Sequence, residues 1–305
     1  MDDSIKQVAG LLKSRQCLAW LGSGLSEPAG YPNWKDTLHI LAERCFDGPG
    51  HLDGAIDSER YLEAAEECRA KSERDGDSRY HRTLAALFGQ RVVTRRLAYE
   101  LLIKLPFTGY ITTNYDPLLQ YEAQGRDCRL LSYPGLLAES GDGKPVYYIH
   151  GCARREESPN GDNLVLAQSE YDEAYEDPGI VRAFLMQKLA SSHVLFIATE
   201  LKDPQVREAL KRLSRAIRQI GNAGQLAGRP RYCLLRAAPN REVAERDAEF
   251  YRDLGIEEVF YFQRGDDRFS GLEDFLERLC READVPLPAP IPTVKSGIEA
   301  PLGVQ

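Results

Sequence analysis

The chain has 305 residues, 43% hydrophobic and 28% charged, which is ordinary for a globular protein of one large or two small domains. Its formal net charge of −8 argues against broad binding to a nucleic-acid backbone as its main activity. No apolar run approaches the roughly 20 residues of a membrane span, and the N-terminus is acidic where a secretion signal would be basic. We therefore expect a cytoplasmic protein.

Short apolar runs alternate with longer amphipathic segments, which is typical of parallel strands joined by crossover helices. The predicted strands are mainly apolar on both faces, as expected of strands covered by helices on both sides. Asp177-Pro178 and Asp203-Pro204 each read as a helix N-cap followed by proline at the first helical position. The predicted strands are 17–21, 109–113, 146–150, 193–198, 232–236 and 257–262, and the predicted helices are 34–45, 117–123, 179–190, 204–218, 240–253 and 268–281.

Two segments lie outside this alternation. Residues 51–104 are polar, favour helix and show no strand pattern, so we interpret them as an all-helical insertion that serves as a lid, an assembly surface or only structural cover. The tail, 283–305, is rich in proline and is either flexible or an extended arm that docks on a neighbouring subunit. Residues 1–50 and 105–282 remain as the main domain.

The seven cysteines are widely spaced and contain no C-x-x-C pair. An odd number without such pairs indicates neither a disulfide framework nor a zinc ribbon. We interpret most of them as small buried hydrophobic residues.

The segment "WLGSGLSEPAGYPNW" (20–34) reads as a strand end, a glycine-rich turn and a helix start. Gly22, Ser23, Gly24 and Ser26 fit a loop whose backbone N–H groups approach a phosphate. The dinucleotide fingerprint G-x-G-x-x-G would need its third glycine at Glu27, so this loop does not match it. A strand-turn-helix with two glycines can also bind nothing.

Two further strands deliver polar residues to the expected C-terminal edge of the sheet, where ligands bind in open α/β folds. "ITTNYDPLL" places Asn114 and Asp116 there, although Asp116 precedes Pro117 and can equally cap the next helix. "VYYIHGC" delivers His150 and Gly151. A lone histidine is more often structural, but this one shares the edge with the glycine loop and Asn114.

Together, "GSGLSEPAGYPNW", "TTNYD" and "IHG", in this order and separated by a helical insertion, resemble the NAD-binding domain of the sirtuin superfamily. The first segment is similar to the sirtuin pattern G-A-G-x-S-x-x-x-G-I-P-D-F-R, the second to T-Q-N-x-D and the third to the catalytic H-G. "GYPNW" and "TTNYD" are more similar to the bacterial sirtuin-like NAD hydrolases of antiphage defence, a resemblance that covers roughly residues 10–282.

This resemblance implies an α/β fold, with a Rossmann-like open parallel sheet, helices on both faces and an all-helical insertion. It implies cleavage of NAD between nicotinamide and ribose, with Asn114 orienting water or the ribose, His150 as general base and Asp116 holding the network or stabilising charge. The residues expected to contact NAD are Gly22, Ser23, Gly24, Ser26, Pro32, Asn33, Thr113, Thr199, Glu200 and Asp203.

The chain departs from the family patterns in three places. It lacks the paired cysteines of the zinc module that deacylating sirtuins carry, so we expect no zinc. Asn33 stands where sirtuins have the aspartate of G-I-P-D-F-R, as in the defence branch. Ala198, Thr199 and Glu200 stand where the family has glycine, an aromatic residue and serine, so Glu200 either opposes an anionic cofactor or bonds its ribose.

We therefore expect an NAD glycohydrolase, the effector subunit of an antiphage, abortive-infection system. The alternatives are a non-catalytic subunit that binds NAD or ADP-ribose and, third, a zinc-free deacylase. The chain ends soon after the expected catalytic domain, so we expect the sensor in another polypeptide, by analogy a HerA-type ATPase or a short Argonaute, and we expect a homo-oligomer. Direct nucleic-acid binding is not expected.

Overall fold

The structure is a computed structural model that describes residues 2–13, 17–89, 97–138, 141–153, 163–176, 179–221, 232–237, 241–263 and 270–288. The described strands are β1 (Cys17–Leu21), β2 (Gly109–Thr112), β3 (Cys128–Ser132), β4 (Lys144–Tyr148), β5 (His193–Ile197), β6 (Tyr232–Ala237) and β7 (Ile256–Phe262). The helices are α1 (Asp2–Lys13), α2 (Trp34–Cys45), α3 (Asp53–Asp57), α4 (Tyr61–Arg74), α5 (Arg79–Phe88), α6 (Leu97–Lys104), α7 (Leu118–Ala123), α8 (Gln168–Tyr175), α9 (Ile180–Ser191), α10 (Pro204–Gly221), α11 (Arg241–Asp253) and α12 (Ser270–Glu282). Two short 3₁₀-helices, η1 (Ser23–Leu25) and η2 (Glu27–Ala29), follow β1.

The described strands form one parallel sheet in the order β3-β4-β2-β1-β5-β6-β7. The central strand β1 pairs with β2 on one side and with β5 on the other. The chain thus places β2, β3 and β4 on one side of β1, with β3 at the edge and β4 between β3 and β2, and then returns to build the other side with β5, β6 and β7. This arrangement is the open, Rossmann-like parallel sheet that the sequence predicted, and its strand order places the topological switch point at β1.

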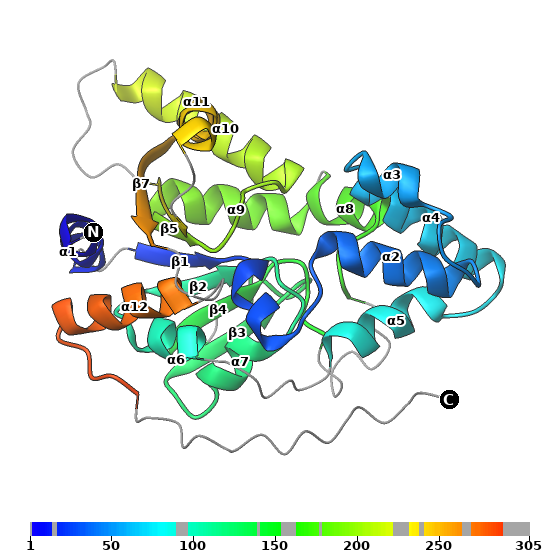
Figure 1. Ribbon diagram of the computed structural model, residues 1–305, viewed down its shortest axis with the longest axis horizontal. Helices are drawn as coiled ribbons and strands as arrows, with labels where there is room; N and C mark the ends of the chain where they lie inside the picture. Colours follow the sequence, from blue (N-terminus) through cyan, green and yellow to red (C-terminus); the bar gives the residue numbers. More distant parts are fainter. Residues whose placement is uncertain are drawn as a thin grey trace.

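Helices cover both faces of the sheet (Figure 1): α9, α10 and α11 lie on one side, and α6, α7 and α12 lie on the other. Alternation along β1 matches this, because Cys17, Ala19 and Leu21 belong to one hydrophobic core and Leu18 and Trp20 to the other. Each face therefore has its own apolar layer, which explains why the sequence of β1 is apolar throughout.

The predicted elements agree closely with the observed ones. All six predicted strands and all six predicted helices are present, and Asp203 caps α10 by accepting the backbone N–H groups of Gln205 (3.0 Å) and Val206 (2.8 Å) through Oδ1. Asp177-Pro178 lies outside the described residues. The sequence did not predict α1, α8 or β3. Most of β3 is only partly buried at the end of the sheet, and its short run "CRLLS" lacks a clear alternation.

The described residues of segment 51–104 contain no strand, and they form α3, α4, α5 and α6 joined by turns. The first three pack against α2 or one another, whereas α6 contacts α7 and α12. At the start of the tail, Val285 and Leu287 pack against the core, and Lys104 Nζ donates a hydrogen bond to the Pro286 carbonyl (3.2 Å). Residues 289–305 lie outside the described part.

Six of the seven cysteines are buried, which confirms their interpretation as core residues. Among the described helices, none combines the length and the apolar character that crossing a membrane requires.

Candidate active site

Four neighbouring parallel strands end at the same edge of the sheet, and their loops carry the predicted site residues. Thr112 of β2 is in register with Leu21 of β1 and with Tyr148 of β4, and Leu21 is in register with Ile197 of β5. Asn114 comes two residues after Thr112, and His150 comes two residues after Tyr148. The structure therefore brings both residues to the carboxyl edge of adjacent strands, next to the switch point where open α/β sheets bind ligands.

The Asn114 side chain is held by the glycine loop. Its Nδ2 donates to the Gly22 carbonyl (3.1 Å) and to Ser26 Oγ (3.1 Å). The Asn114 backbone N–H donates to Thr112 Oγ1 (3.0 Å), whose hydroxyl in turn donates to the Leu21 carbonyl (2.9 Å). Because both amide hydrogens of this buried residue are engaged, its carbonyl oxygen Oδ1 is the group that can meet a ligand.

Ser26 is the centre of a buried polar network. Its hydroxyl donates to Asp116 Oδ2 (2.6 Å) and accepts from Asn114 Nδ2, and it lies 2.8 Å from the Tyr99 hydroxyl. Because the single hydroxyl hydrogen of Ser26 is donated in the bond to Asp116, Ser26 Oγ is the acceptor in the bond with the Tyr99 hydroxyl. Sequence reasoning missed Tyr99, because a tyrosine on the apolar helix α6 looks like any core aromatic residue.

Asp116 both bonds the start of a helix and anchors this network. Its Oδ1 accepts the backbone N–H of Leu118 (3.1 Å), the first residue of α7, although the N-cap position itself is Pro117 and not Asp116. Burial raises the pKa of Asp116 to about 6, although the hydrogen bonds from Ser26 and the Leu118 N–H oppose the shift. Above this pH the network holds a buried negative charge beside Asn114.

His150 lies in a second buried cluster, with two tyrosines of α8 and the N-cap of α10. Its Nε2 is 2.7 Å from the Tyr175 hydroxyl and 3.9 Å from Asp203 Oδ2, and its ring packs edge-on against Tyr171 (5.1 Å between centroids). The Tyr171 hydroxyl donates to the same Asp203 oxygen (2.6 Å). Burial lowers the pKa of His150, with the Asp203 charge opposing, so the imidazole is neutral at physiological pH.

Sequence reasoning did not find the tyrosine pair, because α8 itself was not predicted. Tyr171 and Tyr175 stand four positions apart and stack at 5.5 Å, the spacing that places two side chains on one helix face. Gly151 follows His150 with φ of +84°, and a Cβ there would collide with the Asn163 carbonyl. The H-G pair therefore needs glycine for backbone reasons.

The glycines of the first loop make close contact with the β5–α10 connection. A Cβ on Gly22 would lie 2.5 Å from the Ala198 carbonyl oxygen and 2.6 Å from Thr199 Cβ. The Gly22 and Gly24 N–H groups donate to the carbonyls of Ile197 (3.0 Å) and Ala198 (3.2 Å). In this structure these amides are bonded to protein, so the close approach that requires glycine is to residues 198 and 199.

The remaining predicted contact residues surround this loop. Ser23 is exposed in η1, Pro32 and Thr113 are partly buried, and Asn33 caps α2 by accepting the Asp36 N–H (2.9 Å). Ala198 has φ of +53°, a conformation that glycine adopts without strain. The exposed Glu200 carboxylate lies 2.9 Å from Lys202 Nζ, which offsets its charge.

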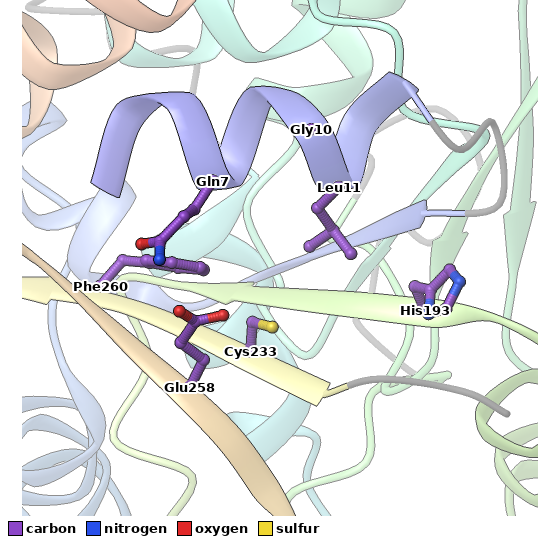
Figure 2. A pocket seen from close by; sticks show the side chains of 7 residues that line it. All are labelled: Gln7, Gly10, Leu11, His193, Cys233, Glu258 and Phe260. Atoms are coloured by element: carbon purple, nitrogen blue, oxygen red, sulfur yellow. The ribbon is translucent and has the colours of Figure 1, made fainter. Parts of the chain in front are cut away.

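A separate cavity of about 430 Å³ lies between α1 and strands β5, β6 and β7, away from this edge (Figure 2). Gln7 and Leu11 of α1 and Phe260 and Glu258 of β7 line it, and His193, the first residue of β5, marks it as near the amino ends of the strands. It contains none of the predicted site residues. Among the described residues, no group of three or more His, Cys, Asp or Glu side chains is arranged to hold a metal ion.

Comparison with known protein families finds a match over part of the chain. Residues 108–259, which include β2, β4, β5 and the Asn114 and His150 loops, match the family described as SIR2-like domain. Residues 108–259 are therefore similar to a SIR2-like domain, which agrees with the resemblance of the sequence to the sirtuin superfamily.

The chain is also similar to individual proteins. The chain is 25% identical over 254 residues to the NAD(+) hydrolase ThsA of Acinetobacter baumannii, covering 82% of this chain and 48% of the relative. It is 24% identical over 236 residues to the protein of that name from Cytobacillus dafuensis, covering 76% and 43%. The chain spans about half the length of these curated relatives. The crystal structure of a SIR2 homolog–NAD complex matches over 91% of this chain and 94% of its own, with 11% identity and a TM-score of 0.47.

Proposed function

We propose that the protein is an NAD+ hydrolase that cleaves the nicotinamide–ribose bond to give nicotinamide and ADP-ribose. The observation that carries the proposal is that Asn114 and His150 follow the carboxyl ends of the adjacent strands β2 and β4, next to the switch point of the sheet. Each side chain is held by its own buried network. The match to the SIR2-like domain and the similarity to NAD(+) hydrolases support the same reaction.

The reaction asks for little acid catalysis, because nicotinamide leaves from a cationic ring and takes the bonding electron pair with it. It requires stabilisation of an oxocarbenium-like centre and a positioned water. Asn114 Oδ1 accepts a hydrogen bond from that water or from a hydroxyl of the nicotinamide ribose. The buried Asp116 carboxylate, ionised above pH of about 6, keeps Ser26 and Asn114 in place and adds negative charge near the developing cation.

His150 is the general base. As the water oxygen bonds to the ribose carbon and the bond to nicotinamide breaks, the neutral imidazole takes the water's proton and later releases it to solvent. The depressed pKa of His150 keeps it in the neutral form that this step needs. In this proposal Ser23 and the glycine loop face the pyrophosphate, after the Gly22 and Gly24 N–H groups are released from the Ile197 and Ala198 carbonyls.

The biological role we propose follows from the resemblance to the defence branch. Hydrolysis of NAD in the cytoplasm of an infected cell would stop phage replication, so the activity must stay silent until infection. We propose regulation through homo-oligomerisation or through a partner polypeptide such as a HerA-type ATPase or a short Argonaute. The helical insertion and the proline-rich tail are the candidate contact surfaces.

One observation favours a second function, a non-catalytic subunit that senses NAD or ADP-ribose. Ala198 occupies a left-handed conformation where the family has glycine, and its carbonyl takes the Gly24 N–H that a phosphate would otherwise receive. If this contact persists with ligand bound, the pyrophosphate is held too weakly or too far away for hydrolysis.

Chromatography and calorimetry separate the two functions. The purified protein is incubated with NAD, alone and with the product of the adjacent gene, and nicotinamide and ADP-ribose are quantified. Release of both products in equal amounts supports the hydrolase. Stable NAD binding in calorimetry without any product, unchanged in Asn114→Ala, supports the sensor. Nicotinamide release that depends on an added acyl-lysine peptide would instead identify a deacylase.

A further inference from the structure

We propose that Tyr175 and Asp203 are positioning residues that hold His150 as the tautomer protonated on Nε2, so that Nδ1 is the nitrogen that takes the proton. The catalytic part of this proposal rests on the proposed function, whereas the tautomer is a property of the folded protein alone. Neither tyrosine of α8 touches the reacting atoms in this account; Tyr175 acts through the histidine.

The contacts of the His150 ring engage Nε2 and leave Nδ1 as the nitrogen that can take a proton. Nε2 faces the Tyr175 hydroxyl at 2.7 Å and the Asp203 carboxylate at 3.9 Å. Nδ1 is buried and has no hydrogen-bond partner among the described residues, in a side chain that is only 1% exposed. The two nitrogens therefore lie in different environments: Nε2 faces a hydroxyl and a negative charge, and Nδ1 faces no partner in the part of the chain that the structure describes.

The Asp203 charge selects the proton position. A carboxylate close to Nε2 favours an N–H bond on that side, because the partial positive charge of the hydrogen then faces the negative oxygen. Hydrogen-bond counting does not separate the tautomers, since a proton on Nδ1 leaves that N–H without an acceptor among the described residues and a proton on Nε2 leaves the Tyr175 O–H without one. The carboxylate therefore places the proton on Nε2 and leaves the lone pair on Nδ1.

The partners of Nε2 are themselves fixed. Asp203 accepts the Gln205 and Val206 N–H groups through Oδ1, so its Oδ2 is turned toward Tyr171 and His150. Helix α8 is tied to the helical insertion, because Glu66 accepts both the N–H (2.9 Å) and the hydroxyl (2.6 Å) of Ser169. The insertion thus supports the helix that places Tyr175 against the histidine.

The first test reads the tautomer directly. In protein labelled with nitrogen-15 histidine, the two ring nitrogens of a neutral imidazole give distinct shifts for the protonated and the unprotonated site. Five histidines are present, and the signals of His150 are those lost in His150→Gln. We expect a protonated Nε2 and an unprotonated Nδ1 in the wild type at pH 7.5. A protonated Nδ1 would overturn the proposal.

The second test measures turnover of NAD by Tyr175→Phe, which removes only the hydroxyl. We expect kcat to fall about 10- to 100-fold with KM within about twofold, since a displaced base affects the chemical step and not binding. Tyr110→Phe is the matched control, because its hydroxyl is also buried and hydrogen-bonded, to the Leu102 and Ile103 carbonyls, on the other side of the sheet. Equal kcat for Tyr175→Phe and Tyr110→Phe would refute the positioning role.

A further variant keeps the proposal testable if Tyr175→Phe folds poorly. Asp203→Asn removes the charge but keeps a good N-cap for α10, so the fold should persist. We expect a lower kcat and a larger share of the Nδ1-protonated form. A wild-type protein that never hydrolyses NAD would contradict the proposed function, and the nitrogen spectra of the wild type and Asp203→Asn would still decide the tautomer. An unchanged tautomer in Asp203→Asn would refute the role of the carboxylate.

Discussion

The buried carboxylate of Asp116 should make the protein less stable as pH rises from about 4 to about 6. Asp116 is fully enclosed, and its oxygens receive hydrogen bonds from the Ser26 hydroxyl and the Leu118 N–H. These two bonds do not compensate the loss of water around the charge, so burial raises its pKa from 3.8 to about 6.

The magnitude follows from this pKa. A group whose pKa is higher in the folded than in the unfolded state holds its proton more tightly when folded, so its contribution is fully present below pH 3.8 and is lost as pH rises through about 6. A tenfold change in proton affinity corresponds to about 1.4 kcal/mol, so the two values imply a loss of about 3 kcal/mol. Asp116→Asn removes the titration but keeps the shape.

The assay is urea unfolding of the wild type and Asp116→Asn at pH 4, 5, 6 and 7. The variant carries a constant offset from its altered hydrogen bonds, and only the change with pH is diagnostic. We expect the free energy of unfolding of the wild type, relative to the variant, to fall by about 3 kcal/mol across this range. A difference that stays constant, or that grows in favour of the wild type, would refute the raised pKa.

Three other substitutions have outcomes that the structure defines. Ser26→Ala leaves Asp116, Tyr99 and Asn114 each short of one hydrogen bond. We expect this variant to lower the free energy of unfolding by about 3 kcal/mol and to abolish NAD turnover. Near-wild-type stability and turnover would contradict the network. Gly22→Ala forces a methyl against the Ala198 carbonyl and should lower the free energy of unfolding by about 1–3 kcal/mol. The control Gly10→Ala, whose added methyl has nothing within 4 Å, should be neutral or stabilising in thermal unfolding. Equal melting temperatures of the two variants would contradict the close contact at Gly22. Glu66→Ala removes both hydrogen bonds to Ser169 and should lower the free energy of unfolding by about 1–2 kcal/mol in urea unfolding. The control Glu63→Ala removes an exposed ion pair with Arg60 and should change it by less than about 0.5 kcal/mol. Similar effects of the two substitutions would refute the anchoring of α8.

Much of the fold could be predicted because the physics is local. The six predicted strands lie between turn or polar residues and are mainly apolar on both faces, and Asp203-Pro204 marks a helix start by its own chemistry. By contrast, α8 carries "QSEYDEAY", whose buried positions are tyrosines and alanine among acidic residues. Its helix is stabilised by distant partners such as Glu66, which sequence periodicity does not reveal.

The candidate site divides in the same way. Asn114, Asp116 and His150 could be located from the sequence because each follows a strand, and parallel strands present their carboxyl ends at one edge. Tyr99 and Tyr175 could not be located from the sequence, because the residues around a tyrosine do not show whether its hydroxyl bonds a site residue or its ring only fills the core. The glycine loop was interpreted through its phosphate chemistry alone, whereas the structure shows that Gly22 is also needed for the approach of Thr199.

The most direct test of the account is NAD turnover by the wild type, Asn114→Ala and His150→Ala, measured as nicotinamide released over time under the condition in which the wild type is most active. The account predicts equal release of nicotinamide and ADP-ribose by the wild type, and loss of at least about 100-fold in each variant, because one positions the reacting group and the other takes its proton. Undiminished nicotinamide release from either folded variant would contradict it.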